Sequence, residues 1–233
     1  MSILGIKDSG EKIVIDGLIR YFDAAQIRSY PGSGTSWTDL IRDNTTGSLV
    51  NGPTFNSSNG GSINFDGTND KVNFADTGLP TGTSSRTVSI WFLFDQMRFQ
   101  AAISYGTPNV TNSRQNWAIG TLNNKIWMTT EGPNYNFGED TRTVNTWYNA
   151  AATYDGTNLT RFINGVQVAT NNVVTDGAQL NTVLNGTLRI GDYDTVFGGP
   201  WDGRVANVLI YNRALTSAQV LQNYNAQRVR FGL

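Results

Sequence analysis

The last third of the chain constrains the fold most, because it holds an Asn-Gly pair between two runs of β-forming residues. Asn164 and Gly165 separate residues 159–163 from residues 166–169. A type I′ turn needs positive φ at both central positions, and Asn followed by Gly meets this requirement with little strain. Residues 147–154 lie just upstream and have the composition of a further strand. We therefore expect three consecutive antiparallel strands.

Residues 203–211 predict another strand, covered on both faces. Strict alternation places Val205 and Asn207 on one face and Ala206 on the other. Residues 216–219 (TSAQ) then have the form of a capping box, in which Thr and Gln side chains bond to amides at a helix start. We expect a short C-terminal helix there, docked through Val220, Leu221 and Tyr224.

Further β-forming runs are separated by turn residues at short intervals, as expected of a β-sandwich. Residues 86–94 read as a central strand because of their aromatic content. Residues 29–49 are rich in turn residues and are expected to form a loop around Trp37. Other strands are expected at residues 17–26, 62–74 (two, around Asp66-Gly67), 100–106, 116–122 and 125–130. The tryptophans within strand patterns, expected in the core, are Trp91, Trp117, Trp127 and Trp147.

Uniform composition over 233 residues favours one domain, residues 17–233, preceded by an N-terminal arm at residues 1–16. The net charge of −1 gives no electrostatic drive toward nucleic acid, and the arginines are scattered and expected on the surface. The chain has no Cys and no His, which excludes disulfides, thiolate nucleophiles, His-ligated zinc and a Ser-His-Asp triad. We see no signal peptide and no apolar run of ~20 residues, so no membrane partner is expected.

Five segments in this order and spacing resemble the laminin-G-like, concanavalin A-like jelly roll of lectins and glucanases. They are residues 65–70 (FDGTND), 87–94 (TVSIWFLF), 151–168, 188–191 (LRIG) and 201–220. The resemblance implies an all-β fold, an antiparallel jelly-roll β-sandwich with a short C-terminal helix.

A second resemblance concerns residues 17–40 and 51–70, which are similar to a stretch common in structural proteins of tailed bacteriophages. It implies a non-enzymatic virion protein, an accessory or capsid decoration component, made in the host cytoplasm and located in the virion. Its partners would be other virion proteins, and an oligomer is expected in the particle. The alternative is a carbohydrate-binding adhesin or tail-fibre module that recognises host surface polysaccharide.

The loop at residues 191–203 (GDYDTVFGGPWDG) is the main candidate for ligand binding. Aromatic faces stack on sugar rings and carboxylates accept hydroxyl protons, so its composition suits a carbohydrate. Three Asp residues also suit calcium. In a structural alternative, Trp201 and Phe197 seal the sandwich edge and the Asp residues form turns. The candidate ligand-binding residues are Asp192, Tyr193, Asp194, Phe197, Trp201 and Asp202.

Two weaker candidates follow the same logic. The loop expected at residues 131–142 presents Tyr135 and Phe137 with Glu139 and Asp140, and the alternative to ligand binding is a mobile or partner-facing loop. Asp66 and Asp70 flank a turn, and turn formation is a sufficient explanation for both.

The sequence lacks the acidic residues expected for a calcium site and for glycoside hydrolysis in relatives. Relatives usually carry an acidic pair where Ala206 and Asn207 stand here, so calcium is in doubt and no cofactor is expected. Related glucanases place Glu-x-Asp-x-x-Glu on one strand, so that acid and nucleophile share a cleft. That spacing is absent here, and the only glutamates are Glu11, Glu131 and Glu139. We expect no catalytic residues.

Overall fold

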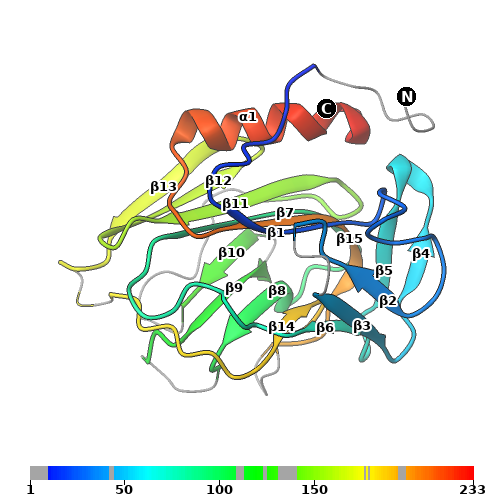
Figure 1. Cartoon of the computed structure of the whole chain (residues 1–233), viewed down its shortest axis with the longest axis horizontal. Helices are drawn as coiled ribbons and strands as arrows, with labels where there is room; N and C mark the ends of the chain where they lie inside the picture. Colours follow the sequence, from blue (N-terminus) through cyan, green and yellow to red (C-terminus); the bar gives the residue numbers. More distant parts are fainter. Residues whose placement is uncertain are drawn as a thin grey trace.

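The strands form two antiparallel sheets packed face to face, with a helix on the outside of one of them (Figure 1). The computed structural model describes residues 10–41, 45–108, 113–122, 125–130, 141–175, 177, 179–193 and 198–233. This arrangement confirms the predicted all-β antiparallel sandwich with one C-terminal helix.

In the described residues, sheet A has eight strands and sheet B has seven. Sheet A runs in the order β13 (Val166–Asn172), β12 (Asn158–Ile163), β11 (Tyr148–Tyr154), β7 (Arg86–Phe94), β15 (Asp202–Tyr211), β5 (Ser62–Asp66) and β4 (Thr54–Asn56), and β1 (Leu18–Asp23) also pairs with β15. Sheet B runs in the order β10 (Lys125–Thr129), β9 (Asn116–Leu122), β8 (Gln100–Gly106), β14 (Leu188–Ile190), β6 (Lys71–Phe74), β3 (Thr46–Val50) and β2 (Ser36–Thr38).

The meander in the last third forms as predicted. β11, β12 and β13 are neighbours in sheet A, and Ile163 lies opposite Val166 across the turn. Asn164 has φ 51° and Gly165 has φ 76°, the positive values that a type I′ turn requires. The Asn164 side-chain oxygen also accepts the Asn149 N–H at 2.9 Å, which ties the turn to β11.

The loop predicted at residues 29–49 was wrong in part, because β2 and most of β3 lie within it. These strands are short and lie at one edge of sheet B, where pairing rather than local composition defines them. They carry two core side chains, Leu49 and Trp37, and Trp37 is fully buried against Phe22 and Phe74.

Strict alternation along β15 was also wrong, since a β-bulge shifts the register between Val205 and Asn207. A bulge adds one residue and changes which side chains face inward. Val205 therefore joins Val208 in the core between the sheets, whereas Ala206 packs with Trp91 on the outer face of sheet A.

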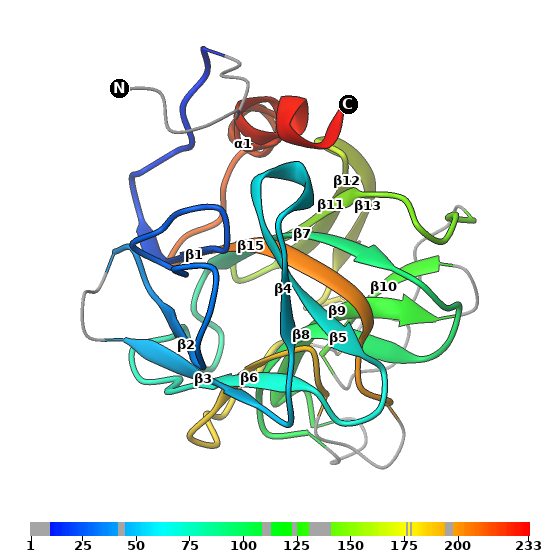
Figure 2. The ribbon, with the colours of Figure 1, turned by 90° about the vertical axis from the view of Figure 1, so that its right-hand side faces the viewer.

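Helix α1 (Ser217–Arg228) covers that outer face, followed by the short 3-10 helix η2 (Val229–Phe231) (Figure 2). The predicted capping box is present, with Thr216 accepting from the Gln219 N–H and the Gln219 side chain bonded to the Thr216 N–H. Val220 is buried and Tyr224 stacks on Trp91 at 5.6 Å between ring centroids. Leu221, expected to dock, is instead 44% exposed.

The described end of the predicted arm, residues 10–16, packs against α1 (Figure 1). The Val14 N–H donates to Asn223 Oδ1 at 2.8 Å, and the Tyr211 hydroxyl donates to the Val14 carbonyl at 2.8 Å. Val14 is buried in the apolar cluster under the helix. This segment is therefore held on its own domain.

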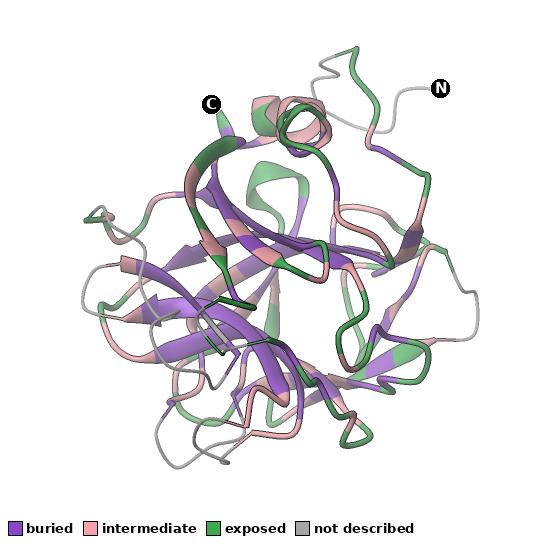
Figure 3. Cartoon of the chain, turned by 90° about the vertical axis from the view of Figure 1, so that its left-hand side faces the viewer, coloured by how far each residue is buried: buried purple, intermediate pink, exposed green. Residues whose placement is uncertain are grey.

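Burial follows the layers, with buried residues concentrated in the strands (Figure 3). Trp91, Trp117, Trp127 and Trp147 are all buried, as predicted. Among the described residues, no helix has the length and apolar character needed to cross a membrane.

The expectation that the arginines lie on the surface was wrong for three of those described, since Arg20, Arg86 and Arg161 are buried. Arg86 donates to several backbone carbonyls, including Pro80 O at 3.0 Å, and to the Thr182 hydroxyl at 2.8 Å. These bonds compensate the guanidinium for lost hydration, so Arg86 has a structural role.

Candidate functional site

The predicted ligand-binding loop connects β14 to β15 and borders the outer face of sheet B. Asp194 and Phe197 lie outside the described residues. Asp192 follows β14 closely, and its carboxylate contacts Lys71 Nζ of β6 at 3.1 Å. The Ser104 hydroxyl of β8 donates to the Asp192 carbonyl at 2.7 Å. The start of the loop is therefore fixed to two strands of sheet B, and the Asp192 charge is balanced.

Tyr193 and Trp201 are buried. Tyr193 is 3% exposed and meets Trp127 edge to face, with 5.6 Å between ring centroids. Trp201 is fully buried between the sheets and packs on Phe92 at 5.0 Å. Neither ring offers an open face to a sugar in this conformation, and Trp201 seals the sandwich as the structural alternative proposed. That the loop binds a ligand remains a prediction.

Asp202 begins β15, opposite Asp66 of β5. Its N–H donates to Gln100 Oε1 at 2.8 Å. Burial raises the pKa of the Asp202 carboxyl above its ordinary value, and the charges of Asp95 and Asp66 add to this while Arg98 opposes it. The described acidic residues here do not assemble as a metal site, since no described group of three or more could hold a metal ion.

The weaker candidates differ in outcome. Asp66 accepts the Thr68 N–H at 2.8 Å, and Asp70 accepts the Asp66 N–H at 3.1 Å, so both hold the turn between β5 and β6. Of the second loop, residues 131–140 lie outside the described residues. Arg142 at its end places its guanidinium carbon 5.7 Å from the centroid of the Tyr148 ring.

The outer face of sheet B carries a row of polar residues that the sequence analysis missed. Strand register places Ser48 opposite Asn73, Asn73 opposite Arg189, and Arg189 opposite Ser104. The row therefore crosses β3, β6, β14 and β8 as neighbours. The alternate residues on these strands, such as Val72 and Leu188, are buried in the core. A period of two in KVNF and LRI is the signal that indicates such a face.

This polar row, which we call the sheet B row (Ser48, Asn73, Arg189 and Ser104), combines hydrogen-bond donors and acceptors. Ser48 is exposed, Asn73 and Arg189 are half-buried, and Ser104 is buried with its hydroxyl bonded to the Asp192 carbonyl. Asn73 Oδ1 is buried without a hydrogen bond among the described residues. The Lys71–Asp192 ion pair lies at the edge of the row, next to the predicted loop. The described start of the loop thus borders the row.

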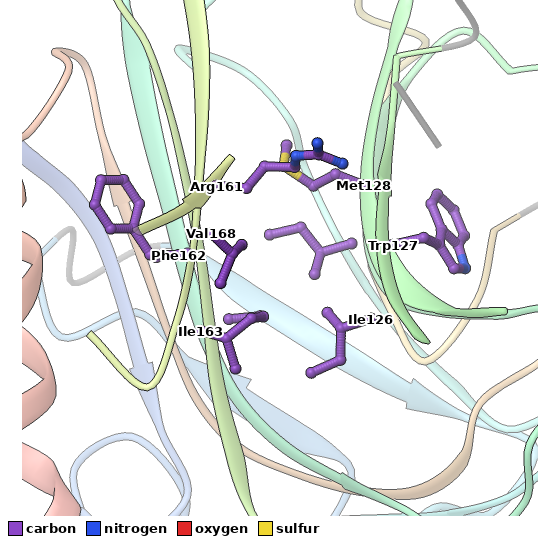
Figure 4. A pocket seen from close by; sticks show the side chains of 10 residues that line it. Ile126, Trp127, Met128, Arg161, Phe162, Ile163 and Val168 are labelled. Carbon is purple, nitrogen blue, oxygen red and sulfur yellow. The ribbon is translucent and has the colours of Figure 1, made fainter. Parts of the chain in front are cut away.

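An apolar gap opens between the two sheets, where β10 faces the β12–β13 hairpin (Figure 4). In Figure 4 the side chains of Ile126 and Ile163 reach toward each other, whereas Trp127 extends to the far side of β10. The cavity has a volume of about 20 Å³. A single water needs ~10–15 Å³. The gap is therefore a packing defect between the sheets and has no room for a sugar.

The fold and this polar face define a lectin-like β-sandwich, and comparison with protein families places it more closely. Residues 66–221 match the model of the concanavalin A-like lectin/glucanases superfamily. The match covers more than half of the chain, so the chain belongs to this superfamily. No curated protein matches it in sequence.

Solved structures with the same fold come from several kinds of protein. Domain 4 of AbnA, a GH43 extracellular arabinanase from Geobacillus stearothermophilus in complex with arabinotriose, has a TM-score of 0.66 and 17% identity, over 90% of this chain and 98% of that one. Trypanosoma rangeli sialidase has a TM-score of 0.68 and 14% identity, over 94% of this chain and 34% of that one. The botulinum neurotoxin serotype G binding domain has a TM-score of 0.66 and 14% identity, over 89% of this chain and 50% of that one. At these identities the likeness shows the fold alone.

Proposed function

We propose that the chain is a non-enzymatic carbohydrate-binding module that recognises a host surface polysaccharide through the outer face of sheet B. The sheet B row is the observation that carries this proposal. Neighbouring strands are ~4.8 Å apart, so the three members that reach the surface, Ser48, Asn73 and Arg189, form a polar line of ~10 Å across three strands. A line of that length spans more than one sugar unit of an extended chain.

The chemistry of the row suits hydroxyl groups. The exposed Ser48 hydroxyl both donates and accepts, the Asn73 amide nitrogen donates, and Arg189 supplies planar donors. Sugar hydroxyls also donate and accept, so each has a partner of the required kind. Family membership and the arabinotriose complex of the AbnA domain support a saccharide over other polar ligands.

A glycan array tests the proposal with two variants and a matched control. Asn73→Ala and Arg189→Ala should each weaken binding about tenfold, since each removes groups that bond to the ligand. Arg228→Ala removes an exposed arginine at the end of α1 and should leave binding unchanged. Tyr193 and Trp201 do not serve as test positions, because replacing a buried ring also removes core packing. Absence of glycan binding by the wild type would exclude the proposal.

We also propose that the module does not hydrolyse its ligand. Retaining or inverting hydrolysis needs two carboxyl groups facing one another across the glycosidic bond. Asp192 is the acidic residue at the edge of the sheet B row, and it pairs with Lys71. Release of reducing sugar by the wild type, lost in Asp192→Asn, would contradict this.

The virion role is a separate proposal that rests on the resemblance of residues 17–40 and 51–70 to phage structural proteins. In that setting the chain would be an accessory or decoration protein in an oligomeric array, and its saccharide-binding face would point outward. Locating the chain by imaging in purified particles tests this, and its absence from them would exclude it.

A further inference from the structure

A second polar cavity lies on the opposite side of the sandwich from the sheet B row, beside α1. It has a volume of about 140 Å³ and lies among β1, the N-terminal segment, the last turn of α1 and η2. A single water needs only ~10–15 Å³, so this cavity has room for a small ligand. Residues near both ends of the described chain line it. Figure 2 shows these two ends on the same side of the molecule, where α1 lies.

The floor of the cavity is a buried ion pair. Asp23 Oδ1 lies 2.7 Å from Arg230 Nη1, and the two side chains are 5% and 6% exposed. Arg230 Nε donates to the Asn59 carbonyl at 2.5 Å, and Nη2 donates to the Gly61 carbonyl. Every nitrogen of this guanidinium therefore has a protein partner. The cavity holds one guanidinium against the carboxylates of Asp23 and Glu11, so it disfavours an anionic ligand.

The wall supplies neutral hydrogen-bonding groups. The Tyr21 hydroxyl donates to Asp23 Oδ2 at 3.0 Å. Burial, followed by the Asp23 charge, raises the Tyr21 pKa well above its ordinary value, so the hydroxyl stays protonated. Trp91 Nε1–H donates to Gln227 Oε1 at 2.8 Å, and the Gln227 side chain is also hydrogen-bonded to Tyr21. Gln26 adds a second side-chain amide.

Apolar groups complete the wall, since Ile13 and Ala226 also line the cavity. The side-chain amides of Gln26 and Gln227 beside the carboxylates of Asp23 and Glu11 match the vicinal hydroxyls of a sugar, which donate and accept in alternation. Ile13 and Ala226 offer apolar contact to the C–H groups of the ring. We propose that this cavity is a second saccharide site, which takes one neutral sugar residue. This inference rests on the proposed carbohydrate-binding function but not on the sheet B row.

Two indole N–H groups make the two sites separately observable by ¹H–¹⁵N NMR of the full chain. Trp91 bonds to Gln227 in the cavity wall, whereas Trp127 contacts Tyr193 beside the sheet B row. Their signals are assigned with Trp91→Phe and Trp127→Phe. The probes are arabinose, glucose, galactose, N-acetylglucosamine and their oligosaccharides. A saturable shift of the Trp91 signal is expected with at least one of them.

Gln26→Ala should weaken that Trp91 response about tenfold, because it removes a side chain that faces the ligand. Gln179→Ala, an exposed glutamine outside the cavity, should leave it unchanged. If sugars shift Trp127 but never Trp91, the cavity proposal is wrong and the proposed function stands. An unaltered Trp91 response in Gln26→Ala also overturns the cavity site. If neither signal responds to any saccharide, both proposals are wrong.

Discussion

At the scale of single residues, Asn164 combines a conformational role with a hydrogen bond. It has φ 51°, and its side chain accepts the N–H of Asn149. Asn164→Ala should lower the free energy of unfolding by about 1–3 kcal/mol, measured by urea denaturation, because Ala adopts positive φ at a cost and loses the bond. Gly adopts positive φ without strain, so Asn164→Gly removes only the hydrogen bond. It should therefore lower the free energy of unfolding by less than Asn164→Ala does. Equal losses for both variants would show that the backbone conformation contributes nothing.

Asp202 makes stability depend on pH at the residue scale. Its folded pKa is raised, first by burial and then by Asp95 and Asp66, against the effect of Arg98. A carboxyl with a raised folded pKa binds more protons folded than unfolded, so stability falls as pH rises from about 4 through the folded pKa. Asp202→Asn should lack this fall and should be more stable than the wild type at pH 7. Thermal melts of the wild type and of Asp202→Asn from pH 3 to 7 measure this difference. If the melting temperatures of the two proteins change with pH in parallel, the prediction is wrong.

At the scale of elements, local signals predicted what local chemistry controls. The Asn-Gly turn, the capping box at Thr216 and the aromatic strand β7 are each defined by their own residues. β2 and β14 have only three residues each and exist because a neighbour pairs with them. The bulge in β15 likewise depends on partners, so alternation alone misplaced Val205.

In the candidate site, too, local sequence predicted some features and tertiary packing determined the others. Composition identified the aromatic loop, but Tyr193 and Trp201 are buried by Trp127 and Phe92, which come from strands far away in the sequence. The sheet B row needs the register of four strands, of which β14 was marked only by a resemblance. Residue types were therefore predictable, whereas their exposure and alignment depend on the tertiary fold.

Helix α1 provides a prediction at the element scale. Thr216→Ala removes the hydroxyl that accepts the Gln219 N–H and should lower the free energy of unfolding by about 1 kcal/mol. Ser217→Ala, one residue later, removes an exposed hydroxyl bonded to Gln167 and should change stability by less than about 0.5 kcal/mol. Chemical denaturation of both variants measures the difference, and equal effects would mean that the cap contributes no stability.

At the scale of the whole molecule, the two ends of the described chain meet on one face of sheet A. Residues 10–16 bond to α1, and η2 returns to β1 and to the turn near Asn59 through Arg230. Phe231 packs on Trp91 at 4.1 Å between centroids. Part of the outer face of sheet A is thus covered by α1 and η2, whereas the outer face of sheet B carries polar residues on β3, β6 and β14 that reach the surface. The proposed ligand-binding face therefore belongs to sheet B, whereas the face that α1 and η2 cover belongs to sheet A.

The Asp23–Arg230 pair should therefore be a whole-molecule determinant of stability. Arg230→Met leaves Asp23 buried without its cation and should lower the free energy of unfolding by about 3–5 kcal/mol, measured by urea denaturation. Asp23→Asn with Arg230→Met removes both charges and should recover part of that loss, because no buried charge remains. A loss below about 1 kcal/mol for Arg230→Met would show that the C-terminal segment is not anchored by this pair. If the effects of Arg230→Met and Asp23→Asn on the free energy of unfolding simply add in the double variant, the two charges act independently.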